Sequence, residues 1–138
     1  MIFLFDLIGN LGSFTLVKML VPALMSILFL QSGLDKVFNY KDNLDYFTDH
    51  FKKSPLSKTV GLLMPTITLL EVAAGISSAI GTVSLLFGSE IWAYWGMMLS
   101  GVSLLALFFG QRVAKDYAGA GALTGYFILV VVGLLILT

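Results

Sequence analysis

Cysteine is absent from this chain of 138 residues, and histidine occurs once, as His50. Without thiols the chain can form no disulfide, thiol relay, iron–sulfur cluster or Cys-ligated zinc site. A single histidine also excludes a haem held between two histidines of the same chain. The composition therefore excludes several large classes of electron-transfer cofactor.

Charge is equally scarce. Only 12% of the residues are charged, against roughly a quarter in soluble domains. Eight Lys plus Arg balance eight Asp plus Glu, so the sequence offers no basic surface for nucleic acid. Hydrophobic residues, in contrast, make up 58% of the chain. This balance is typical of an integral membrane protein.

Four apolar segments are long enough to cross a bilayer, which takes about 20 residues. They are Leu16–Phe38, Thr59–Val83, Trp92–Gly110 and Ala120–Leu137. Unpaired backbone groups are costly in hydrocarbon, and apolar runs of this length satisfy them as helices. No long linker or repeat divides the chain. The sequence therefore predicts one all-α domain over residues 1–138, a four-transmembrane-helix bundle.

The connection between the first two spans predicts a further helix. Tyr40, Leu44, Phe47 and Phe51 recur at helical spacing, while acidic residues and lysines fall mainly on the other side. This pattern is typical of an amphipathic interfacial helix, lying in the headgroup plane and ending near the next proline. A docking surface for a partner is the alternative. We expect His50 on this helix to be solvated.

The basic residues predict the orientation. Seven of the eight lie at the end of the first span or in the connections after the first and third spans, and only Lys18 lies elsewhere. Because Lys and Arg accumulate in cytoplasmic connections, we expect both of these connections in the cytoplasm and both termini outside it.

Small residues predict where the helices touch. Gly121 and Gly125 form a Gly-x-x-x-Gly pair, and Gly33 and Gly75 lie in the first and second spans. Helices in lipid approach one another closely at such positions. We favour packing within the bundle, and a homodimer face is the alternative.

Glu71 is the most informative polar residue. It lies about twelve residues into the second span, which at a rise of ~1.5 Å per residue is near the bilayer centre. A charge at that depth costs at least about 2.5 kcal/mol. Glu71 must therefore face the bundle interior and find partners there, or be protonated.

The candidate partners of Glu71 come from the first and third spans. Gln31 lies five residues before Lys36 and so ~7.5 Å deeper, near the level expected for Glu71. We expect one polar cluster with an outer and an inner part. The outer part is Lys36, Arg112 and Asp116, and the inner part is Gln31, Gln111 and Glu71.

Two interpretations of this cluster remain open. Its outer groups also suit an ordinary cytoplasmic turn, and Glu71 either fastens helices together or recognises a ligand, a proton or a partner. The sequence contains no set of residues that predicts a metal site or a catalytic constellation.

Several short motifs resemble those of the DoxX-like membrane proteins. They are Phe29-x-x-x-Gly33-x-x-Lys36, Leu70-Glu71-x-x-x-Gly75, and Phe109-x-Gln111 followed by Lys115-Asp116. Their order and spacing cover nearly the whole chain. The resemblance implies a multi-pass protein of the bacterial cytoplasmic membrane that assists other proteins. Resemblance to the small subunit of a thiosulfate:quinone oxidoreductase implies quinone as a candidate cofactor, although the residues themselves assign none.

Three functions are compatible with these observations. The one we favour is an accessory, non-catalytic subunit that supports assembly or partner docking in a hetero-complex of membrane proteins, for which the resemblance implies a link to redox chemistry. A quinone-reactive small subunit would use Glu71 and Lys36 to hold or protonate the quinone ring. A small transporter or lipid-binding protein would use the same polar interior.

Overall fold

A computed structural model describes the backbone of residues 2–138 and the side chains of residues 14–138. It contains α1 (Ile2–Phe38), α2 (Tyr40–His50), α3 (Val60–Leu86), α4 (Ile91–Val113) and α5 (Tyr117–Leu137). The part of α1 from Phe14 onward, together with α3, α4 and α5, is long and apolar enough to cross a membrane. The prediction of a four-helix membrane bundle with a short helix after its first span is confirmed.

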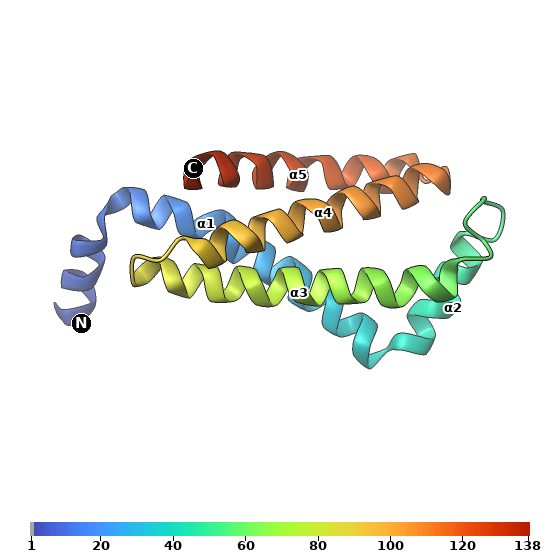
Figure 1. The fold of residues 1–138 in the computed structure, drawn as a ribbon, viewed down its shortest axis with the longest axis horizontal. Helices are drawn as coiled ribbons and strands as arrows, with labels where there is room; N and C mark the ends of the chain where they lie inside the picture. Colours follow the sequence, from blue (N-terminus) through green and yellow to red (C-terminus); the bar gives the residue numbers. More distant parts are fainter. Residues whose placement is uncertain (1) are drawn as a thin grey trace.

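The four long helices run side by side with alternating direction (Figure 1). The most extensive contacts join α1 to α3 and α3 to α4, while α5 packs mainly on α4 and only briefly on α1. Both termini lie at one end of the bundle together with the α3–α4 turn, where Lys18 pairs with Glu90. The opposite end carries α2 and the α4–α5 turn, and we call it the α2 end.

The helix bounds differ from the predicted ones mainly at α1 and α2. α1 begins at Ile2 instead of Leu16, because the glycines in this stretch lower helix propensity without ending the helix. Its first turns lie at an angle to the rest of α1 (Figure 1). α2 ends at His50, and residues 51–59 form turns around Pro55, which cannot continue a helix.

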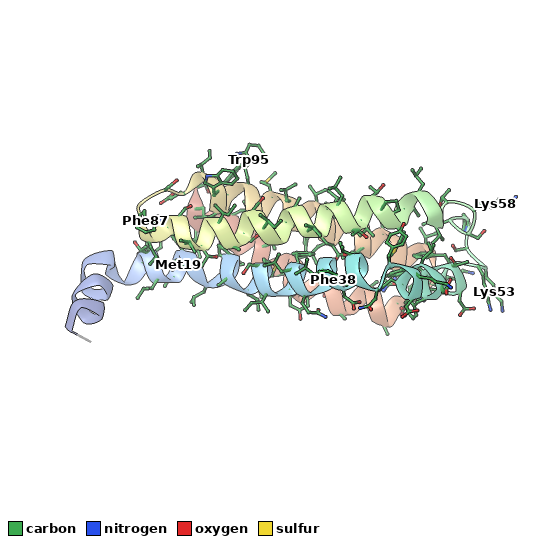
Figure 2. The ribbon with its side chains drawn as sticks, turned by 90° about the horizontal axis from the view of Figure 1, so that it is seen from below. Met19, Phe38, Lys53, Lys58, Phe87 and Trp95 are labelled. Carbon is green, nitrogen blue, oxygen red and sulfur yellow. The ribbon has the colours of Figure 1, made fainter. Side chains whose placement is uncertain are left out.

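α1 and α3 are staggered along the bundle axis. A Cβ at Gly33 of α1 would meet the backbone nitrogen of Val72 in α3, so these two residues lie at the same level. Gly33 is five residues from the end of α1, whereas Val72 is twelve residues from the start of α3. At ~1.5 Å per residue, α3 therefore begins about 10 Å beyond the end of α1. α2 lies at a slant beside this overhanging part of α3 (Figures 1 and 2).

Glycines allow the close contacts between the central helices. A Cβ at Gly75 would lie 2.7 Å from the backbone nitrogen of Leu30 in α1, and one at Gly96 would lie 2.7 Å from that of Ser78 in α3. A Cβ at Gly33 would lie 2.8 Å from a methyl group of Val72. These helices are therefore in backbone-level contact, the form of packing that lipid favours.

Gly121 and Gly125 are placed differently. Both are exposed on α5, and a Cβ built on either would have no described atom within 4 Å. The Gly-x-x-x-Gly pair thus makes no contact within the described bundle, contrary to the interpretation we favoured from the sequence.

Gly75→Ala tests the backbone contact of α3 with α1. We expect the free energy of unfolding to fall by about 1–3 kcal/mol, because the new methyl group would force the two backbones apart. Gly101→Ala is the matched control, since its Cβ would lie 3.5 Å from the Val130 side chain, an ordinary contact. Equal stability of the two variants in detergent unfolding would contradict the packing described.

Candidate functional site

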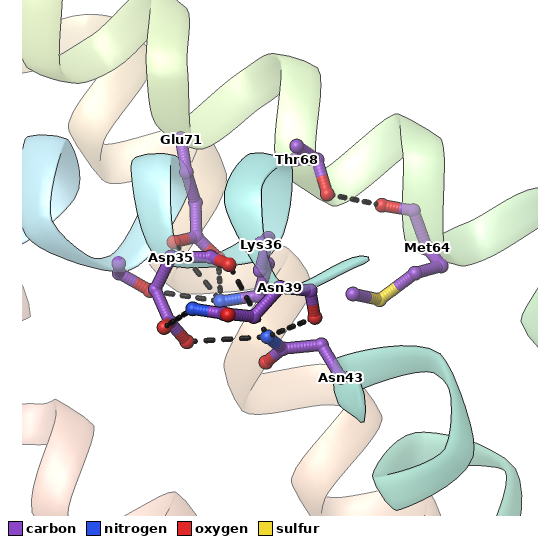
Figure 3. A network of polar contacts seen from close by, with 8 residues as sticks. Asp35, Lys36, Asn39, Asn43, Met64, Thr68 and Glu71 are labelled. Atoms are coloured by element: carbon purple, nitrogen blue, oxygen red, sulfur yellow. Dashed lines mark hydrogen bonds and ion pairs between the residues drawn. The ribbon is translucent and has the colours of Figure 1, made fainter. Parts of the chain in front are cut away.

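A buried ion pair joins α1 to α3. The Nζ atom of Lys36 lies 3.1 Å from Oε1 and 3.3 Å from Oε2 of Glu71, and it donates a hydrogen bond of 2.8 Å to Oγ of Ser32. The Lys36 side chain is 8% exposed and that of Glu71 is fully buried. Figure 3 shows both side chains meeting between the two helices. Each charge is thus neutralised inside the protein and kept from lipid.

The surroundings of this pair explain how it forms. The absence of a side chain at Gly33 brings α1 against Val72, the residue after Glu71, so the two charged side chains can reach each other. The Phe47 ring of α2 lies 5.9 Å from Nζ of Lys36, a favourable position for a cation–π contact. Lys36 is therefore covered by an aromatic ring on the side of α2.

One oxygen of the carboxylate is only partly satisfied. Oε1 of Glu71 is the oxygen nearer to Nζ, yet its angles are poor, and it accepts no hydrogen bond from any described group. The two groups still form an ion pair, because the 3.1 Å between Nζ and Oε1 is well within Coulomb contact, which has weak angular requirements. The carboxylate retains unused acceptor capacity.

A second set of polar residues runs along the outside of α1 into α2. Nδ2 of Asn39 donates to Oδ1 of Asp35 at 2.9 Å, and Nδ2 of Asn43 donates to Oδ2 at 3.2 Å. Figure 3 shows these contacts beside the ion pair. Gln31 lies one turn before Asp35 on the same face and is exposed. We call Gln31, Asp35, Asn39 and Asn43 the polar stripe.

The polar stripe lies deep in the bundle. By the same register Asp35 is level with Leu70, ~15 Å from the start of α3, a helix of 27 residues or about 40 Å. Gln31 lies ~6 Å further in and so near the middle of α3. Both residues are exposed on the surface of the bundle. Polar groups at this depth normally face the interior of a membrane protein.

A third polar group links α2 to the α4–α5 turn. Nε2 of His50 lies 2.8 Å from Oε1 of Gln111 and 3.6 Å from Oδ2 of Asp116. Asp116 also caps α5 by accepting a hydrogen bond of 2.9 Å from the backbone N–H of Gly119. The His50 side chain is 18% exposed, so it is not the solvated residue that we expected.

The six residues expected in one cluster are thus divided among four places. Lys36 and Glu71 form the ion pair, and Gln111 and Asp116 contact His50. Arg112 is exposed, with its guanidinium 4.3 Å from the centre of the Tyr117 ring. Gln31 points outward in the polar stripe. The prediction of one cluster assumed that the first span ends at the level where the second span begins. The stagger of α1 against α3 shows that this assumption is wrong.

Some of the contacting residues were missed by sequence reasoning. Asp35, Asn39 and Asn43 recur every four residues, a spacing that would have marked one helical face. His50 lies three residues after Phe47, on the apolar side of α2, which would have indicated a packed histidine.

Comparison with known proteins found no relative of this chain. No protein-family model, curated protein or solved structure matches the chain. Among the described residues, no group of three or more Cys, His, Asp or Glu could hold a metal ion.

A double-mutant cycle tests the ion pair. Lys36→Met and Glu71→Gln should each lower the free energy of unfolding by about 3–5 kcal/mol, because each leaves a buried charge without its partner. The double variant should lose clearly less than the sum of the two single losses. Unfolding of the purified protein in mixed detergent micelles, followed by Trp92 and Trp95 fluorescence, measures these values. Strict additivity would contradict the pair.

His50→Ala tests the attachment of α2. This helix has no fully buried residue, so losing the bond to Gln111 should raise the fraction of detached α2 roughly two- to tenfold. Trypsin should then cleave faster after Lys52 and Lys53, while helix content stays unchanged. Asp45→Ala, at an exposed position of the same helix, should cleave at the wild-type rate. Equal cleavage of all three proteins would show that His50 does not hold α2.

Proposed function

We propose that this protein is a non-catalytic accessory subunit of a membrane protein complex, and that the polar stripe is where a transmembrane helix of its partner docks. The observation that carries this proposal is the exposure of Gln31 and Asp35 near the middle of the bundle. In a bilayer these groups would face hydrocarbon at a cost of several kcal/mol. A partner helix that donates hydrogen bonds removes this cost.

The geometry of the stripe supports a helix as the ligand. Asn39 and Asn43 occupy both oxygens of Asp35, so the carboxylate is held in one position. Gln31 and Asp35 lie one turn apart on α1, the repeat at which a second helix presents its own side chains. Interhelical hydrogen bonds in membranes contribute about 0.6–2 kcal/mol each. A few such bonds would give a specific contact without catalytic chemistry.

The proposal includes the DoxX-like family and the bacterial cytoplasmic membrane. The motif residues of α1 and α3 lie together in this fold, which supports the resemblance. Gly33 and Gly75 belong to the contact of α1 with α3, and Lys36 and Glu71 form the ion pair at that contact. Gln111 lies in the polar group that attaches α2.

Photo-crosslinking in native membranes tests the docking surface. A photoreactive residue at Gln31 should give a discrete cross-linked product with one other membrane protein. The same residue at Ile27, one turn earlier on α1 and 70% exposed, should cross-link mainly to lipid. Asp35→Leu should reduce the protein cross-link from position 31 at least about tenfold, because the fixed acceptor of the contact is lost.

Two results would contradict this function. Lipid products alone at position 31 would show that no protein covers the stripe. A product of two copies of this chain would identify a homodimer face instead of a partner site.

Cysteine labelling tests the proposed orientation. Because the chain has no native cysteine, only the introduced cysteine can react. A cysteine at Ser89, in the α3–α4 turn, should react with an impermeant reagent on intact cells. A cysteine at Ser57, at the α2 end, should react only after the membrane is opened. The reverse pattern would place the α2 end outside the cytoplasm.

A further inference from the structure

An apolar groove of about 250 Å³ lies under α2, on a different part of the surface from the polar stripe. The first turns of α3 form its floor, Phe47 and Phe51 of α2 cover one side, and the end of α4 forms the other. Thr66 and Gln111 are the only lining residues with polar side chains. The Thr66 hydroxyl already donates to the backbone of its own helix. The groove therefore suits a hydrocarbon chain.

The length and position of the groove correspond to one leaflet. Its floor runs from Val60 to Leu70, ten residues or ~15 Å along α3. This is about half of the ~30 Å hydrocarbon core of a bilayer. The groove begins at the α2 end of the bundle and reaches almost to the level of Glu71. It can therefore hold one acyl chain that enters from the headgroup region.

The mouth of the groove is cationic. Lys53 and Lys58 follow the lining residues Phe51 and Leu56 in the connection to α3, and Figure 2 shows both at the α2 end. Among the described side chains, neither lysine takes part in an ion pair.

The acidic groups near the mouth are already engaged. Asp49 pairs with Lys52 at 2.9 Å, and Asp116 contacts His50 and caps α5. The net field at the mouth thus favours an anion, and a phosphate there would meet ammonium donors.

We infer that this groove is a binding site for an anionic phospholipid, with one acyl chain beneath Phe47 and Phe51 and the phosphate beside Lys53 and Lys58. The cationic mouth distinguishes this ligand from a zwitterionic lipid with the same chains. Because the site and the polar stripe use different residues, the inference does not rest on the proposed function.

Native mass spectrometry of the full chain tests the site. The detergent-purified protein is mixed with equal amounts of dioleoyl phosphatidylglycerol and dioleoyl phosphatidylcholine, which share their acyl chains. The wild type should retain the anionic lipid preferentially. Lys53→Gln together with Lys58→Gln should reduce this preference by about fivefold for each cation removed. Lys41→Gln, at the far end of α2, is the charge-matched control and should keep it.

Substitutions that fill the groove distinguish binding of the acyl chain from electrostatic attraction of the headgroup. Ala106→Phe on α4 and Thr66→Phe on α3 both place a ring in the groove from exposed positions, and each should reduce retention of both lipids at least about fivefold. Ala122→Phe on α5 adds the same ring outside the groove and should change nothing. Equal retention of the two lipids by the wild type, or wild-type retention by both groove variants, would overturn the proposal.

Discussion

The rest of this structure depends on the need to neutralise a carboxylate inside a membrane bundle. Glu71 is satisfied by Lys36, and this contact fixes the axial position of α1 against α3. The resulting stagger leaves the first turns of α3 without α1 beside them, and α2 occupies part of that space. The groove under α2 and the depth of the polar stripe both follow from this axial position of α1 relative to α3.

The stagger also separates two kinds of surface. On the outside of α1, polar groups lie where hydrocarbon is expected, which favours contact with another protein. Under α2, apolar groups lie next to free cations, which favours contact with lipid. A small protein with these two surfaces can link a partner to a particular lipid environment, and neither surface requires a catalytic group or a cofactor.

The sequence predicted most of the fold and less of the site. Span length and hydropathy are local properties, so the four spans and the amphipathic α2 could be derived from them. The pairing of Glu71 with Lys36 instead of Gln31 depends on the relative level of two helices, which no local pattern encodes. The packing of His50 could be read from its place on the apolar side of α2. Its partner Gln111 could not, because only the position of α2 brings the two side chains together.

The ion pair also has a consequence for biogenesis. A helix that carries an unpaired charge partitions from the translocon into lipid at a cost of about 2.5 kcal/mol or more. Here the two charged helices are consecutive spans, and Lys36 precedes Glu71 by only 35 residues. At about 5–20 residues per second, ribosomal synthesis delivers Glu71 roughly 2–7 s after Lys36. The first two spans can thus leave the translocon as a neutral hairpin, before α4 and α5 have been made.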